Sequence, residues 1–289
     1  MNYKAIAGNV LAPKAGKIHT EESRHARRAY RSRFSFSNAV FAVTIVFLFL
    51  PLVVLVVYSF NGSTSMTWTG FSLRWYRQLL DSRELWRAFN NSILIALTSA
   101  FTATVIGTIG AIGINWYRFK MRSVIHTVSF LPMILPEIII GVSLSIFFAG
   151  IGIPLGLLTI YLAHTTFNLP FVFLLVMARL DEFDFSIIEA AHDLGATEKE
   201  TLFKVTLPIC MPGIVSGFLT AVTLSLEDFV ITFFVAGPGS STLPIFIYSA
   251  ITRRGGITPL ISALSVVMIL GTVILSVTLR KFIKFIAAK

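Results

Sequence analysis

The stretch FSFSNAVFAVTIVFLFLPLVVLVVYSFNGSTSMTWTGFSL, residues 34–73, contains no charged residue. A helix needs about 20 apolar residues to cross the hydrocarbon core of a bilayer, and this stretch supplies them. Further along the chain, residues 88–117 and 255–279 are also free of charge. Two more stretches, 123–178 and 205–252, carry acidic residues but no Lys or Arg. Together these stretches indicate a chain that crosses a membrane several times.

The composition agrees with this interpretation. Hydrophobic residues make up 55% of the chain and charged residues only 13%, too few to cover the surface of a soluble domain of 289 residues. The glycine- and proline-rich segment 150–156 divides the longest stretch in two. The expected fold class is an all-α membrane protein, because the alternating strands of a membrane barrel are absent. We predict six transmembrane helices, at 38–60, 90–115, 124–148, 157–178, 208–236 and 260–282.

The basic residues orient the chain. With the N-terminus in the cytoplasm, 18 of the 24 Lys and Arg residues lie in or beside cytoplasmic segments and 6 lie in outside segments. Cytoplasmic loops are enriched in Lys and Arg, so both termini are expected in the cytoplasm. This placement accounts for the net charge of +10 without a nucleic-acid partner. Residues 1–37 are expected to form a basic cytoplasmic tail, either disordered or an interfacial helix that meets anionic lipid, and residues 38–285 to form the membrane domain.

Motifs for catalysis are missing from the sequence. It contains no G-x-x-x-x-G-K-[ST] phosphate-binding loop and no H-E-x-x-H zinc motif. The five histidines are scattered without metal-ligand spacing, and we interpret His164, inside the fourth predicted span, as a packed and hydrogen-bonded residue. The single cysteine, Cys210, cannot form an internal disulfide. A membrane-embedded enzyme is therefore disfavoured, and no metal or cofactor is expected on this chain.

The cytoplasmic segment between the fourth and fifth predicted spans has the pattern of two short helices, at about 183–200. In the first helix, Ala190 and Ala191 are small enough to let another surface approach closely. Gly195 suits a left-handed helix stop, and Thr197 with Glu200 forms a capping-box pattern that opens the second helix. One apolar face of the first helix is expected to contain Ile187, Ile188, Ala191 and Leu194.

Such an exposed amphipathic helix can dock into the groove of a partner. The alternative is a linker that lies on the membrane. That alternative is weakened because the segment is acidic and anionic headgroups would repel it. The acidic residues are Asp181, Glu182, Asp184, Glu189 and Asp193.

At these residues the chain resembles the permease subunits of binding-protein-dependent ABC importers. The motif of that family is E-A-A-x3-G-x9-I-x-L-P, and this sequence matches it except that Val205 replaces Ile. The resemblance implies that the motif couples the permease to an ATPase. The residues that carry this expected role are Glu189, Ala190, Ala191, Gly195, Leu207 and Pro208.

Other segments resemble the second permease subunit of spermidine and putrescine importers. They include Tyr58-Ser59-Phe60-Asn61, residues 70–76, residues 131–137, residues 164–171 and residues 225–230. The subgroup usually has Asp-Asp-Phe where this chain has Glu227-Asp228-Phe229, which leaves the choice of solute open. A different small solute, such as an amino acid, an opine or a metal ion, is the alternative.

The resemblance also implies partners and a location. A type I ABC importer permease is expected to pair with a second permease subunit in the bacterial inner membrane. Two ATPase subunits would use ATP and Mg²⁺, and an external solute-binding protein would deliver the solute to the outside loops. Trp68, Trp75, Tyr76 and Trp86 are candidates for that dock or for an interface belt.

Three acids in the predicted spans bear on the solute. A carboxylate at bilayer depth costs about 2.5–3.5 kcal/mol on insertion scales, so it usually faces a cavity or a partner. Glu137 follows two prolines that favour a broken helix, and Glu227 and Asp228 are adjacent. No Lys or Arg of these spans neutralises them, so we predict that all three are unpaired within the chain and line a pathway for a cation. The alternative is that they pair with arginines of another subunit, or lie near a water-exposed end of a span and have no role in transport. Asp228, which matches the Asp of the subgroup, is the expected main contact.

An ion-coupled secondary transporter is a hypothesis from a different class. Glu137 and Asp228 would then relay protons. Six spans are few for such a carrier, and the sequence shows no convincing internal repeat. The motif at Glu189 would also have no purpose in it, so the ATP-driven importer is the preferred hypothesis.

Overall fold

The computed structural model describes residues 18–64, 67–116, 120–182, 184, 186–254 and 258–287. Among them, regular structure is helical, apart from an isolated antiparallel bridge between Asn61 and Phe71. The chain divides into two units, Met1–Val57 and Tyr58–Lys289. The expected all-α fold class is therefore confirmed for these residues.

The first unit consists of most of helix α1, Ile18–Ser59. Its stretch Phe36–Ser59 has a mean hydropathy of 3.2 and is long enough to cross a membrane. Apolar side chains lie on all sides of this helix rather than on one stripe, which is typical of a helix surrounded by lipid or by another protein. The first predicted span, 38–60, is confirmed as a helix.

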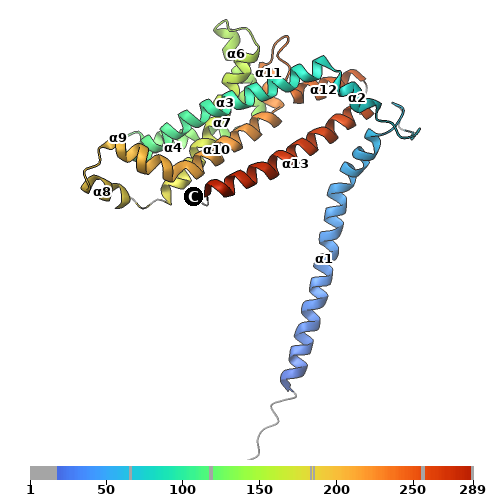
Figure 1. Ribbon diagram of the computed structural model, residues 1–289, viewed down its shortest axis with the longest axis horizontal. Helices are drawn as coiled ribbons and strands as arrows, with labels where there is room; N and C mark the ends of the chain where they lie inside the picture. Colours follow the sequence, from blue (N-terminus) through green and yellow to red (C-terminus); the bar gives the residue numbers. More distant parts are fainter. Residues whose placement is uncertain are drawn as a thin grey trace, which may run out of the picture. The chain divides into compact units, whose positions relative to one another are not determined.

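The second unit contains the remaining helices (Figure 1). They are α2 (Arg74–Leu80), α3 (Arg83–Trp116), α4 (Arg122–Ser129), α5 (Leu131–Ile134), α6 (Glu137–Gly150), α7 (Leu157–Asp181), α8 (Ser186–Asp193), α9 (Glu198–Thr201), a π-helical turn (Leu202–Thr206), α10 (Leu207–Glu227), α11 (Val230–Val235), α12 (Leu243–Arg254) and α13 (Pro259–Ala287).

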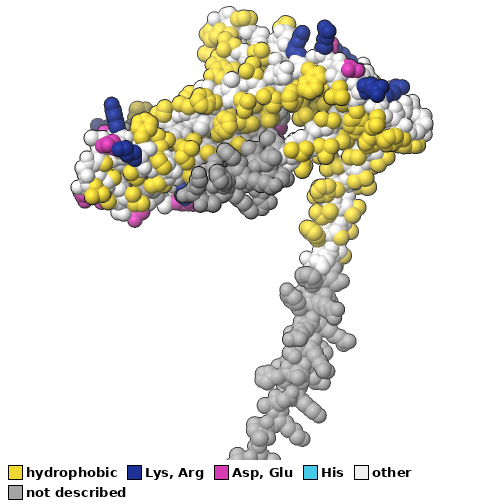
Figure 2. Space-filling view, in the orientation of Figure 1, with side chains coloured by type: hydrophobic (Ala, Val, Ile, Leu, Met, Phe, Trp, Pro, Cys, Tyr) yellow, Lys and Arg dark blue, Asp and Glu magenta, His cyan; other side chains and the backbone are white. Residues whose placement is uncertain are grey.

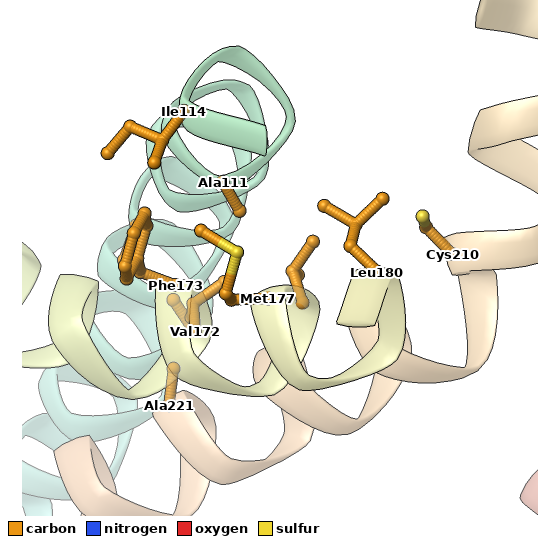
Figure 3. Close-up of a cluster of buried hydrophobic side chains, with 11 residues drawn as sticks. Ala111, Ile114, Val172, Phe173, Met177, Leu180, Cys210 and Ala221 are labelled. Carbon is orange, nitrogen blue, oxygen red and sulfur yellow. The ribbon is translucent and has the colours of Figure 1, made fainter. Parts of the chain in front are cut away.

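The centre of this unit is the packing of α3, α7 and α10 against one another (Figure 3). Small residues let the helices approach: a Cβ on Gly107 or Gly217 would lie 3.0–3.1 Å from Val172 Cγ1. Close backbone approach through small residues is the usual way in which membrane helices associate. The buried residues of this core are Ala100, Ala103, Ala111, Ile114, Val172, Phe173, Val176, Met177, Leu180, Cys210 and Ala221.

Two smaller clusters attach the other helices. The first joins α6 and α11 to α3 and α7, around Phe148, Ile160 and Ile231. The second joins α2, α12 and α13 to the start of α3, around Trp75 and Leu243. Since α6 and α11 meet in the first of these clusters, the packing places the start of α6 near the end of α10.

Two of the predicted spans are not single helices. The third, 124–148, is broken at Leu135–Pro136, where the helix axis bends by 104°. This break confirms the expected effect of the prolines, which remove backbone donors and force extended backbone before them. The fifth, 208–236, was also wrong as one helix, because α10 ends at Glu227 and α11 begins at Val230.

Four described helices are long and apolar enough to span a membrane, or five if the bent pair is one span. The shorter apolar helix Pro259–Ile274 coincides with the start of the sixth predicted span. The count of six and the cytoplasmic placement of the termini stay predictions. Figure 2 shows, for the second unit, an apolar surface between two ends where charged side chains gather, near α8 and α9 and near α2 and α12. This distribution suits a domain that crosses a membrane.

Candidate functional site

Helix α8 contains Glu189, Ala190 and Ala191 and ends at a left-handed glycine. Gly195 has φ of +83°, a conformation that costs other residues steric energy. Its N–H donates to His192 O at 2.9 Å, and Ala196 N–H donates to Ala191 O at 3.0 Å. This pair of bonds is the Schellman arrangement, which satisfies carbonyls at a helix end. The predicted role of Gly195 as a helix stop is confirmed.

The start of α8 is stabilised by an aspartate that the sequence pattern did not single out for this role. Asp184 Oδ1 accepts a hydrogen bond of 2.9 Å from Ser186 N. The bond favours the ionised carboxylate and lowers the pKa of Asp184 below its ordinary value. An Asp two residues before the helix is the signal that could have predicted it.

The second helix of the segment begins with the predicted capping box. Thr197 Oγ1 accepts from Glu200 N at 3.4 Å, while Glu200 Oε2 accepts from Thr197 N at 3.1 Å. The chain then passes through the π-helical turn Leu202–Thr206 into α10, which begins at Leu207 and Pro208. Because Pro208 has no N–H, it cannot complete the α-helical bond to Lys204 O, which is consistent with the local widening.

The predicted apolar face of α8 is only partly covered. Ile188 is buried, whereas Ile187 is 45% and Leu194 is 89% exposed. Glu189 is also exposed and makes no hydrogen bond or ion pair with another described residue. The helix and Leu194, which follows it, therefore present two apolar side chains and the carboxylates of Glu189 and Asp193 on the surface.

The acid Asp228 lies in the break between α10 and α11 and is 8% exposed. Its Oδ2 accepts from Thr232 Oγ1 at 2.6 Å and from Thr232 N at 2.8 Å, and its Oδ1 accepts from Ile231 N at 3.3 Å. His164 Nε2 lies 3.2 Å from Oδ2. The prediction that Asp228 is unpaired was wrong. Its partners include a histidine of another helix and the backbone at the start of α11, which an inventory of Lys and Arg does not reveal.

Glu137 and Glu227 differ from Asp228 in their surroundings. Both are exposed, and neither makes a hydrogen bond or ion pair with another residue that the structure describes. Glu137 is the first residue of α6 and Glu227 the last of α10. Glu137 lies close enough to Glu227 and Asp228 for their charges to interact. The structure thus brings together the three acids that the sequence singled out.

His164 of α7 is 2% exposed and joins this group of acids. Its Nδ1 lies 2.7 Å from Ser225 Oγ and its Nε2 lies 2.9 Å from Thr232 Oγ1. The interpretation of His164 as a packed, hydrogen-bonded residue is confirmed, but its contact with Asp228 was not predicted. No group of three or more metal-ligating side chains occurs among the residues that could be searched.

The aromatic residues of the loop predicted to lie outside, 61–89, separate into two kinds. Trp75 is 3% exposed and donates to Asn61 O at 2.6 Å, and the Tyr76 hydroxyl lies 2.7 Å from Ser59 Oγ. Both residues hold the loop together. Trp68 and Trp86 are 54% and 45% exposed, so these two keep the surface position that a dock or an interface belt needs.

Sequence comparisons identify similar permease proteins. The chain is 39% identical over 249 residues to the spermidine/putrescine transport system permease protein PotC of Haemophilus influenzae, covering 85% of this chain and 96% of that one. It is 43% identical over 235 residues to the putrescine transport system permease protein PotI of Escherichia coli K12, covering 78% and 83%.

Solved structures with the same fold belong to other ABC transporters. A bacterial ABC transporter involved in the import of the acidic polysaccharide alginate matches with a TM-score of 0.72 at 15% identity, over 88% of this chain and 98% of that one. The MetNI methionine ABC transporter matches with a TM-score of 0.59 at 21% identity, over 75% and 99%. These similarities confirm the ABC importer permease fold but select no solute.

Residues 103–289 match the family described as the inner membrane component of binding-protein-dependent transport systems. This match covers more than half of the chain and includes α8, the acids of α6 and α10, and His164. The chain belongs to the family of inner membrane components of binding-protein-dependent transport systems.

Proposed function

We propose that this chain is a non-catalytic permease subunit of an ATP-driven importer, in which it forms half of the pathway for a polyamine such as putrescine or spermidine. The relatives that share 39% and 43% of its residues are permeases of spermidine/putrescine and putrescine transport systems. Their alignments extend over most of this chain.

The coupling role is carried by one observation, the surface of α8. A short helix that is fixed at both ends and exposes Glu189, Ile187 and Leu194 is suited to docking in a groove of a partner. The small side chains of Ala190 and Ala191 let that partner approach the backbone. ATP binding and hydrolysis would then move α8, and with it α10, through α9 and the π-helical turn that connect them.

The cationic solute is supported by the arrangement of Glu137, Glu227 and Asp228. A diamine loses hydration at both ammonium groups when it enters a pathway, and fixed carboxylates offset part of that cost. Glu137 and Glu227 are exposed and have no described partner, so these two can contact the solute directly. Asp228 is buried and contributes its negative charge without contacting the solute.

The proposed partners follow from what this chain lacks. The sequence has no phosphate-binding loop, so ATP and Mg²⁺ would be used by two separate ATPase subunits. A second permease subunit would complete the pathway, and an external solute-binding protein would deliver the solute. The complex would lie in the bacterial inner membrane, as the family description implies.

The test is reconstitution of the whole complex in proteoliposomes with the binding protein. Uptake of labelled putrescine or spermidine is expected only with ATP inside, and vanadate should stop it. Amino acids and metal ions are offered in parallel. Uptake that continues with vanadate and follows a proton gradient would overturn the ATP-driven mechanism, and uptake of an anionic solute alone would overturn the cation pathway.

A further inference from the structure

His164 lies between the two helices that the break separates. Its Nδ1 contacts Ser225, near the end of α10, and its Nε2 contacts Thr232 of α11 and the Asp228 carboxylate. Ser225 also accepts a long hydrogen bond of 3.4 Å from Ser99 of α3. The ring therefore fixes α10 and α11 to the α3–α7 core at the point where the chain changes direction.

The partners determine where the ring protons lie. Thr232 Oγ1, 2.6 Å from Asp228 Oδ2, donates its one proton to that ionised oxygen. The same hydroxyl can then only accept from His164, so Nε2 carries a proton. Ser225 Oγ lies 2.7 Å from Nδ1, the other ring nitrogen. Every polar atom in this buried group thus has a partner, an arrangement that selects one geometry for the break.

This geometry positions the two exposed acids. Glu227 is the residue directly before Asp228, so its direction follows from the backbone of the break. The position of Glu137 depends on the packing of α6 against α11. A Cβ on Gly141 of α6 would lie 3.2 Å from Ile231 Cα of α11, so α6 fits closely against the helix that Asp228 and His164 hold. A shift of α11 would therefore change the distance between the carboxylates of Glu227 and Glu137.

We propose that His164 is a positioning residue of the pathway: it holds Asp228 in the core and thereby sets the spacing of Glu227 and Glu137, which contact the solute. The contact of Glu227 and Glu137 with the solute rests on the proposed function. The positioning itself is a statement about one chain and can be tested without any solute.

The first experiment measures the position of residue 227 in the assembled complex. Cys210 is the only cysteine of this chain, and Cys210→Ser leaves Glu227→Cys as its one thiol. A membrane-impermeant methanethiosulfonate reagent should label this thiol, and His164→Ala should change the rate about fivefold or more, the effect of losing about one buried hydrogen bond. Thr223→Cys, on the same helix before the network, should keep its rate. An unchanged rate at position 227 overturns the proposal.

The second experiment tests whether His164 affects uptake by positioning the acids. In transporting proteoliposomes, His164→Ala should lower uptake about tenfold while the complex assembles and its basal ATP hydrolysis continues, and His164→Gln, which can donate one bond, should recover part of it. Adding Glu227→Gln to His164→Ala should cost much less than Glu227→Gln costs alone, because coupled sites are not additive. Thr102→Val removes a comparable bond between α3 and α7, to Tyr161, and is the control.

The two experiments distinguish a wrong assignment of the solute from a wrong positioning role for His164. A wild-type complex that takes up no polyamine while His164→Ala changes labelling would reject the proposed solute and keep the positioning role. Full additivity of His164→Ala and Glu227→Gln in a transporting complex would overturn the positioning role, as would equal losses in Thr102→Val.

Discussion

Asp228 shows how one side chain can have both a structural and an electrostatic task. Its carboxylate accepts three bonds from Ile231 and Thr232, which together begin α11. A buried charge with this many donors is satisfied locally, so it need not face the solute to be required for transport. The acids that remain for direct contact are the exposed Glu137 and Glu227.

We predict that Asp228→Asn lowers uptake strongly. An amide presents a donor where one of the two carboxylate oxygens accepts, so at least one buried donor loses its partner, at a cost of about 1–3 kcal/mol. The measurement is labelled-polyamine uptake together with the yield of assembled complex. Asp81→Asn, at the exposed end of α2, is the matched control. Wild-type uptake by Asp228→Asn would contradict the prediction.

Gly195 allows a second prediction, which concerns backbone conformation alone. No atom lies within 4 Å of a Cβ built at Gly195, so a substitution there meets no clash and its cost comes from φ of +83°. That cost is about 1–2 kcal/mol for most residues and smaller for Asn. Coupling of ATP hydrolysis to uptake should therefore fall in the order Gly195→Asn, Gly195→Ala, Gly195→Val.

The control for this series is Gly113→Ala, since Gly113 lies in α3 with open space around it. This variant should couple as the wild type does. If Gly195→Val couples as well as Gly195→Asn, the left-handed stop is not needed for the coupling role.

Helix α8 is the element on which the coupling proposal depends. Glu189→Lys places a cation where the wild-type helix presents a carboxylate, and Leu194→Asp removes the most exposed apolar contact. We expect each variant to insert in the membrane normally and to lose uptake and co-purification of the ATPase. The measurements are subunit content by gel and uptake in proteoliposomes. Glu84→Lys, an exposed charge reversal in the first turn of α3, should retain both.

The close packing of α7 and α10 leads to a prediction about stability. A Cβ at Gly213 would lie 2.9 Å from Leu175 O and 2.9 Å from Arg179 Cβ, so Gly213→Ala must push the helices apart. Overpacking of this kind costs about 1–3 kcal/mol. The variant should lower the melting temperature of the purified complex in detergent, whereas Gly113→Ala should not. An unchanged melting temperature would show that the contact can relax freely.

Much of the molecule could be predicted from local pattern. Charge-free stretches predicted the helices, and the residue types at 195, 197 and 200 predicted the ends of α8 and α9, because both features depend on neighbours in the sequence. Tertiary contacts decided the rest. At the break after Glu227, Asp228 pairs with His164 of α7, which is distant in sequence, and no spacing rule reveals this contact. Helices α2 and α12 were missed because they are short and lie in segments that pattern alone treats as loops.

Since the same fold occurs in a transporter that imports an acidic polysaccharide and in a methionine transporter, the fold alone does not select the solute. Glu137 and Glu227 come from two different helices and have no described partner, which leaves both charges for a cation. We therefore predict that Glu137→Gln with Glu227→Gln nearly abolishes polyamine uptake. Binding-protein-stimulated ATP hydrolysis should continue, because α8 is unchanged.

Each single variant should retain a measurable part of the uptake, and Glu227→Asp, which keeps the charge, should retain most of it. The measurement is the ratio of labelled solute imported to ATP hydrolysed, which should fall in proportion to the charge removed while hydrolysis stays level. If hydrolysis falls together with uptake in the double variant, the two acids act in assembly or coupling rather than in the pathway. If the ratio equals that of the wild type, the two carboxylates do not contact the solute.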